Sequence, residues 1–156
     1  MSVIMSQIQI SSPIGQITIS VDNGTVQSIT LFAQETDNNH SSSTTSTLVS
    51  SQLHDYFQQA HNKWSLPLTT KGTPFQQRVW RYLQSIPMGQ TRTYSDVAKA
   101  LNSSARAVGN ACRANPFSIV VPCHRVVSKT GIGGYSGKTE GDELAVKQWL
   151  LNHEQN

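Results

Sequence analysis

The spacing of apolar residues changes along this chain, and that change constrains its fold more than any other feature. Apolar and polar residues alternate over 7–10 and 15–21, which is typical of half-buried strands. Asn23-Gly24 is a strong hairpin signal, so a third strand is predicted over 25–32. Over residues 48–60 the apolar residues fall instead at helical spacing, which predicts a helix.

The second half of the chain is predicted to be mainly helical. Four helices are expected there, over residues 75–86, 94–101, 105–114 and 142–153. Thr93 can cap the second of these helices, and Ser103 or Ser104 can cap the third. Two short helices joined by so tight a turn are a helix-turn-helix candidate, and an ordinary helical hairpin is the plainer explanation.

A domain boundary is predicted near residue 70. Residues 34–47 are polar and rich in Ser and Thr, which favours a loop, and residues 65–73 have the composition of a linker. These patterns divide the chain into a β-rich N-terminal α/β domain, residues 1–70, and a mainly helical domain, residues 71–156. The fold class is therefore predicted to be α/β (α+β).

Charge is distributed unequally between these two parts. The net formal charge of +3 combines −3 over residues 1–70, where one Lys opposes four acidic residues, with +6 over residues 71–156, where eleven Lys or Arg oppose five acidic residues. A basic half suggests an anionic partner, with nucleic acid as the first candidate. A solvated surface explains the same charge, and charge alone favours that plainer explanation.

Composition argues against several other classes of protein. No apolar run is long enough to span a bilayer, and residues 1–6 lack the pattern of a signal peptide, so a cytoplasmic protein without a membrane partner is expected. Cys112 and Cys123 are the only cysteines, and the histidines show no ligand spacing around them. We therefore expect no metal ion and no cofactor.

Pro122-Cys123-His124-Arg125, between two β-branched runs that favour a strand, indicates thiol chemistry. The thiolate is the nucleophilic form of cysteine, and a free thiol with a pKa of ~8.5 is mostly protonated at neutral pH. Lowering that pKa by about two units takes roughly 2.7 kcal/mol, to which His124 and Arg125 are able to contribute. A buried structural cysteine is the plainer alternative.

Three classes of function are compatible with these features. A thiol hydrolase needs a base beside Cys123, but neighbours in a strand point to opposite faces, so His124 fits that role poorly if the segment is extended. A DNA-binding regulator explains the charge and the helices but not the thiol. A DNA-acting enzyme whose thiol attacks a base held outside the stack uses every feature, including the glycine-rich stretch 131–137.

The basic half also resembles a known family. The resemblance runs from about residue 72 to residue 154 and rests on the blocks 72–76, 93–94, 105–109, 113–116, 121–127, 134–137 and 149–151. In this order the blocks resemble those of the O6-alkylguanine-DNA alkyltransferases, also called methylated-DNA–protein-cysteine methyltransferases. The resemblance implies a winged-helix-like helix-turn-helix domain that carries the active cysteine, after a small ribonuclease-H-like α/β domain.

The resemblance implies DNA repair by direct reversal. Cys123 would accept the alkyl group of O6-alkylguanine, and of O4-alkylthymine as well, in one irreversible turnover per molecule. His124 would act as the base through a bridging water, and Glu154 would orient His124. Asn115 would stabilise the turn before the active segment and contact the thiol region.

The resemblance also implies how DNA is held. A monomer would flip the nucleotide out through the minor groove of double-stranded DNA, with Arg106 filling the vacated place in the stack and Tyr94 pushing the 3′ phosphate. The other residues implied to contact the DNA backbone are Ser95, Ser103, Lys129 and Arg113. The residues implied to line the base pocket are Tyr135, Ser136 and Val126.

Three features depart from the family pattern. The chain lacks the ligands of a zinc site that some relatives carry in the N-terminal domain. Residues 137–143 are longer and more acidic than the family's usual glycine link to the last helix. Cys112 occupies a helical position that is usually apolar, and we interpret it as part of the core.

Overall fold

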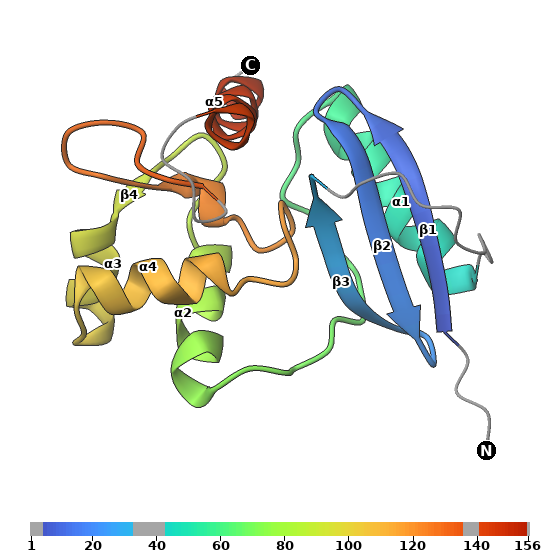
Figure 1. Cartoon of the computed structure of the whole chain (residues 1–156), viewed down its shortest axis with the longest axis horizontal. Coiled ribbons are helices and arrows are strands. Elements are labelled where there is room, and N and C mark those ends of the chain that lie inside the picture. The colour runs from blue at the N-terminus through green and yellow to red at the C-terminus, as the bar shows by residue number, and fades with distance from the viewer. Residues whose placement is uncertain (1–4, 33–42, 136–140, 156) are drawn as a thin grey trace. The chain divides into compact units, whose positions relative to one another are not determined.

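The computed structural model of the chain describes residues 5–32, 43–135 and 141–155. The chain divides into two compact units, Met1–Thr70 and Lys71–Asn156 (Figure 1). Each unit buries apolar side chains of its own, as a separate domain core requires. Within the described residues, strands and five α-helices are combined, which confirms the predicted α/β fold class.

The first unit is built on an antiparallel sheet with the strand order β1-β2-β3. The strands are β1 (Met5–Ser12), β2 (Gly15–Asp22) and β3 (Thr25–Leu31). Asn23 and Gly24 form the turn between β2 and β3, and both have positive φ, 51° and 78°. A turn of this kind matches the right-handed twist of paired strands, which is why the Asn-Gly pair predicted the hairpin.

Helix α1 (Thr44–Gln58) packs against this sheet (Figure 1). Ile17 and Ile19 of β2 are fully buried, and so are Leu53 and Tyr56 of α1. Burying an aliphatic side chain of this size stabilises a fold by roughly 1.5–3 kcal/mol. The apolar residues that alternate along the strands and those at helical spacing in α1 therefore pack together in one core.

Two details of the first unit differ from the predictions. Helix α1 begins within the expected loop because the Ser43 side chain accepts a hydrogen bond from Ser46 N at 3.0 Å, and the Ser46 hydroxyl accepts one from Ser43 N at 2.7 Å. This reciprocal cap makes a helix start out of residues that favour loops. In the predicted linker, Leu68 forms a parallel bridge with Val26 of β3, so that stretch is partly bound to the sheet.

The second unit contains the remaining helices. They are α2 (Pro74–Gln84), α3 (Tyr94–Leu101), α4 (Ala105–Arg113) and α5 (Asp142–Glu154). Hydroxyl side chains cap the first three of these helices, at Thr73, Thr93 and Ser104, so Ser104 rather than Ser103 is the cap of α4. Asn102 ends α3 in the left-handed conformation, with φ 54°, and the turn to α4 completes the predicted helix-turn-helix.

The interpretation of the segment around Cys123 as a strand is wrong. Val121 N donates to Phe117 O at 2.9 Å and Cys123 N donates to Val121 O at 2.8 Å, so turns lead into a short 3₁₀ helix, η1 (Cys123–Arg125). Only β5 (Val126–Val127) is extended, and it pairs in parallel with β4 (Arg92–Thr93). The β-branched run is buried like a strand, but Pro122 has no N–H to donate to a neighbouring strand.

The conformation before Cys123 is strained at one residue. Ile119 has φ 75°, in the left-handed region that a β-branched residue adopts only against steric repulsion. Its side chain is 1% exposed, and the neighbouring Val120 and Val121 are buried as well. Burial of the whole run offsets a strain of about 1–3 kcal/mol and holds the turn in one form.

Gly72 provides a test of the packing that begins α2. Its φ is +125°, and a Cβ atom there would lie 2.6 Å from the Trp80 ring. We expect Gly72→Ala to lower the free energy of unfolding of the second unit by about 1–3 kcal/mol, as measured by urea unfolding followed by circular dichroism. Gly131→Ala is the matched control, because no heavy atom lies within 4 Å of its added Cβ. Equal stability of the two variants would contradict the prediction.

Candidate active site

Cys123 lies at the start of η1 and is almost completely enclosed. The exposed fraction of Cys123 is 9%, so a substrate must enter the site to reach the sulfur. Asn115, just after α4, holds the preceding turn: its Nδ2 donates to Val121 O at 2.8 Å and its Oδ1 accepts from Phe117 N at 2.9 Å. The Asn115 side chain also favours the ionised form of the Cys123 thiol by lowering its pKa, so one amide acts on both the turn and the thiol.

A buried ionic network lies next to this thiol. His124 Nε2 donates to Glu154 Oε2 at 2.8 Å. Arg125 binds the same carboxylate with two donors, Nε to Oε1 and Nη2 to Oε2, each at 2.9 Å. The third contact of the guanidinium is Nη1 to Ile86 O at 2.8 Å. His124, Arg125 and Glu154 are all buried, so this network joins the end of α5 to the active segment.

The network determines which nitrogen of His124 is basic. Burial raises the pKa of Glu154, but hydrogen bonds from His124 and Arg125 outweigh burial and hold that pKa well below its usual range. Burial lowers the pKa of His124 despite its hydrogen bond to Glu154, so the imidazole is neutral at pH 7. An ionised carboxylate only accepts hydrogen bonds, which assigns the single ring proton to Nε2. Nδ1 keeps its lone pair, is buried and has no hydrogen-bond partner among the described residues.

Several groups act on the ionisation of Cys123. Burial raises the pKa of its thiol, while the Asn115 side chain, the positive charge of Lys147 and the Tyr135 hydroxyl favour the thiolate and oppose the effect of burial. Arg125 was expected to contribute to this effect, but its guanidinium is engaged by Glu154 and Ile86 O. Lys147 on α5 is the lysine whose charge acts on the thiol.

Tyr94 and Lys147 lie on the same side of the site. The Tyr94 hydroxyl donates a long hydrogen bond to Gly134 O, at 3.5 Å, and burial raises its pKa to about 12, so the phenol stays neutral. Lys147 Nζ lies 5.9 Å from the centroid of the Tyr94 ring. The ring also approaches Gly133, where a Cβ would lie 3.2 Å from it. A side chain larger than hydrogen at Gly133 would displace the ring.

The other residues predicted for the site fall into three groups. Arg106, Arg113, Ser103 and Lys129 are exposed, Ser95 is half-buried, and Arg106 lies in the first turn of α4. Tyr135 and Val126 are buried, and Val126 directly follows η1, the 3₁₀ helix that begins at Cys123. Ser136 lies outside the described residues.

Sequence reasoning missed the roles of Lys147 and Arg125. Lys147, Leu150 and Glu154 are the buried residues of α5, and they follow one another at intervals of three and four residues. Two charged residues that share one face of a helix with Leu150 are a signal that the sequence contains. Charged residues on a buried face predict hydrogen-bonded or ionic partners inside the protein, but those partners come from segments far away in sequence.

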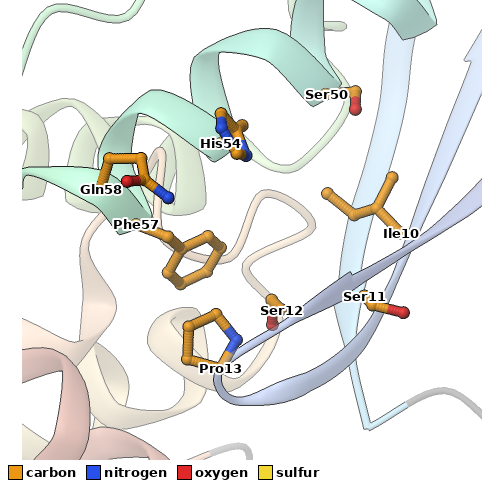
Figure 2. A pocket seen from close by; sticks show the side chains of 8 residues that line it. All are labelled: Ile10, Ser11, Ser12, Pro13, Ser50, His54, Phe57 and Gln58. Atoms are coloured by element: carbon orange, nitrogen blue, oxygen red, sulfur yellow. The ribbon is translucent and has the colours of Figure 1, made fainter.

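The described part of the chain offers little for other kinds of site. In the described part of the chain, no group of three or more His, Cys, Asp and Glu side chains could hold a metal ion. No helix in that part is long and apolar enough to cross a membrane. A pocket of about 390 Å³ lies in the first unit between the β1–β2 turn and α1, where Pro13, His54 and Phe57 face it (Figure 2). None of the predicted site residues lines this pocket.

Comparison with protein families gives one clear match. The family model described as "6-O-methylguanine DNA methyltransferase, DNA binding domain" matches residues 74–156. A probable methylated-DNA–protein-cysteine methyltransferase of Acanthamoeba polyphaga mimivirus is 50% identical over 107 residues, which cover 67% of this chain and 68% of that protein. The constitutive methylated-DNA–protein-cysteine methyltransferase of Bacillus subtilis is 49% identical over 107 residues, which cover 66% of this chain and 62% of the relative.

Solved structures resemble nearly the whole chain. The O6-methylguanine methyltransferase of Mycobacterium tuberculosis superimposes with a TM-score of 0.83 at 31% identity, over 97% of this chain and 93% of the other. A structure of the M. tuberculosis protein OGT in complex with DNA gives a TM-score of 0.80 at 34% identity, over 94% of this chain and 91% of that one. The likeness therefore extends through the first unit, which the family model does not cover.

The network around Glu154 makes a prediction about stability. Because its pKa is lowered in the folded protein, the ionised carboxylate stabilises the fold above its ordinary pKa of 4.5, and this contribution is lost as the pH falls below that value. We expect Glu154→Gln to lower the free energy of unfolding by about 3–5 kcal/mol at pH 7, and by less at pH 3. Urea unfolding at the two pH values measures both differences.

A matched control for this prediction lies on the same helix. Glu143→Gln, in the first turn of α5, removes a carboxylate with no part in the network and should cost less than about 1 kcal/mol. A Glu154→Gln deficit that is the same at pH 3 and pH 7 would contradict the assigned charge state.

Proposed function

The chain belongs to the 6-O-methylguanine DNA methyltransferase family, and we propose that it repairs alkylated DNA by direct reversal, with Cys123 as the acceptor of the alkyl group. The substrate is O6-alkylguanine in double-stranded DNA, and O4-alkylthymine is a second substrate. The observation that carries this proposal is the buried His124–Glu154–Arg125 network next to Cys123. It provides a neutral, oriented base close in sequence to a thiol.

The proposed reaction is a single displacement. The Cys123 sulfur attacks the alkyl carbon, an S–C bond forms as the C–O6 bond breaks, and the electron pair of that bond stays on the guanine. The proton lost by the thiol passes to His124. The guanine that leaves takes up one proton, so the reaction neither gains nor loses a proton overall. The product is unmodified guanine and a thioether on Cys123. Because a thioether is stable, each molecule reacts once.

The network supplies the proton acceptor for this step. His124 Nδ1 carries the free lone pair, and a bridging water connects it with the thiol in the proposed reaction. Glu154 orients the imidazole, and the charge that His124 gains on protonation is balanced by the carboxylate. The Asn115 and Tyr135 side chains favour the thiolate form of Cys123, although burial outweighs them and raises the pKa of the thiol. Because burial raises the pKa of Cys123, the thiol is mostly protonated in the resting protein, and it ionises as His124 accepts its proton.

Residues of the helix-turn-helix, together with Lys129, hold the DNA in this proposal. Arg106 is exposed at the start of α4 and enters the stack from the minor groove when the damaged nucleotide is flipped out. Tyr94 acts on the 3′ phosphate. Flipping costs a few kcal/mol, and less for a damaged, weakly paired base. The remaining proposed contacts to the backbone are Ser95, Ser103, Arg113 and Lys129.

The proposal also covers the base pocket and the setting of the reaction. Tyr135, Ser136 and backbone groups of Val126 surround the flipped base. The protein acts as a monomer, in the cytoplasm, with access to DNA. The net charge of +6 over residues 71–156 supports binding to the phosphate backbone. The boundary near residue 70 separates this DNA-binding domain from an N-terminal domain of residues 1–70.

The acceptor role of Cys123 is tested by mass. Incubation with excess duplex that contains O6-methylguanine should add the mass of one methyl group to the intact protein, on the peptide that contains Cys123, and then stop. Cys123→Ser should accept no methyl group but still bind DNA, because its DNA contacts remain. Cys112→Ser is the matched control and should accept one methyl group. Continued turnover, or methylation of Cys112, would refute the proposal.

The role of Arg106 is tested by comparing two substrates. Arg106→Ala should slow transfer from O6-methylguanine in a duplex by at least about 10-fold, the equivalent of about 1.4 kcal/mol, because the flipped state loses its replacement in the stack. Transfer from free O6-benzylguanine needs no flipping and should change by less than about 2-fold. Arg81→Ala, an exposed arginine of α2, serves as the control. Equal losses on both substrates would argue against the stacking role.

A further inference from the structure

Lys147 is a fully buried lysine whose ammonium has no carboxylate among its hydrogen-bond partners in the described residues. Its exposed fraction is 0%. Nζ donates to Val126 O at 2.6 Å and to Gly134 O at 2.8 Å. Burying an ammonium with only neutral partners costs free energy, because carbonyl groups replace the lost hydration incompletely. Stability of the core therefore does not explain a lysine at this position.

The two carbonyls that Lys147 binds belong to different walls of the site. Val126 follows the 3₁₀ helix that carries Cys123, and Gly134 lies in the glycine-rich segment before Tyr135. Gly134 O also accepts the long hydrogen bond from the Tyr94 hydroxyl. One ammonium on α5 thus connects the active segment, the glycine-rich segment and, through a shared acceptor, helix α3.

The positive charge of Lys147 also acts on the reacting thiol of Cys123. It acts on Cys123 of η1 and on Cys112 of α4, and it lies over the ring of Tyr94 of α3. It also lowers the pKa of His124, which favours the neutral base. These are the titratable groups that interact with the ammonium from the elements around it.

We propose that Lys147 is a positioning residue for alkyl transfer, whose ammonium holds the Val126 and Gly134 walls of the base pocket together beside Cys123. The inference rests on the proposed function, because it assigns Lys147 to that reaction. Lys147 touches no reacting atom. It acts by fixing the geometry in which the thiol meets the alkyl carbon, and a misplacement of about 1 Å costs about 100-fold in rate.

Positioning by an ammonium makes the reaction sensitive to alkaline pH. Burial lowers the pKa of Lys147 from 10.5 to about 8, and the thiols partly oppose this shift. The ammonium is present below about pH 8 and is lost as the pH rises through that value. A thiol by itself becomes more reactive over the same range, so the two effects have opposite signs and can be separated.

The experiment compares two reactions of the same thiol. One is methyl transfer from a duplex that contains O6-methylguanine, and the other is alkylation by iodoacetamide, which needs the thiolate but not the pocket walls. Both are read as mass added to the Cys123 peptide between pH 6 and pH 9. In the unaltered protein, the ratio of the transfer rate to the iodoacetamide rate should fall as the pH rises through about 8.

Lys147→Met tests the same proposal by removing the charge and keeping the chain length. The ratio should be about 100-fold lower than in the unaltered protein at pH 7, and it should not change between pH 7 and pH 9. Binding to undamaged duplex should stay within about 2-fold. Lys63→Met removes an exposed lysine of the first unit and is the control for loss of a positive charge.

The outcomes separate this inference from the proposed function. If the unaltered protein gains no methyl group, the proposed function fails. If it does gain one, and the ratio of the transfer rate to the iodoacetamide rate in Lys147→Met is within about 3-fold of the ratio in the unaltered protein, the positioning role is refuted. If circular dichroism shows that Lys147→Met does not fold, the pH profile of the unaltered protein decides: a fall of the ratio near pH 8 supports the role, and a constant or rising ratio refutes it.

Discussion

The hydrogen-bonded pairing of Glu154 with both His124 and Arg125 is the interaction on which the rest of the site depends. It attaches the last helix to the short 3₁₀ helix that carries Cys123, and it does so inside the protein, where each charge must be compensated. Because burial lowers the pKa of His124, with a smaller contribution from the charge of Arg125, Glu154 can orient His124 without converting it to an imidazolium. The base therefore remains able to accept a proton.

The same network explains why an irregular backbone persists next to the thiol. Ile119 is strained and Pro122 prevents strand pairing, so the turn has little intrinsic stability. Asn115 satisfies two backbone groups of this turn, and Arg125 is bound to Ile86 O and to Glu154 on the other side of Cys123. The active segment is thus held at both ends by side chains rather than by a sheet, which keeps a small group of atoms rigid around the sulfur.

Prediction from sequence succeeded where local patterns determine structure. The hydroxyl caps Thr93 and Ser104, the Asn23-Gly24 turn and the apolar faces of the helices each act within a few residues, and the structure contains these elements. The predicted family and α/β fold class are confirmed. The strand predicted around Cys123 was wrong because a run that is buried on every side looks the same in sequence whether it is extended or turned. The assigned roles of the site residues stay predictions.

The sequence by itself determined the identity of the chemistry: a thiol next to a histidine, in a basic helix-turn-helix half whose blocks match one family. Only the tertiary structure decided how the charges are paired. Arg125 adjoins the thiol in sequence but binds Glu154, while Lys147, distant in sequence, is the lysine whose charge acts on Cys123. The physical reason is that hydrogen bonds and Coulomb interactions depend on distance in space, and the distances between α5, η1 and the glycine-rich segment are set by packing of the whole unit.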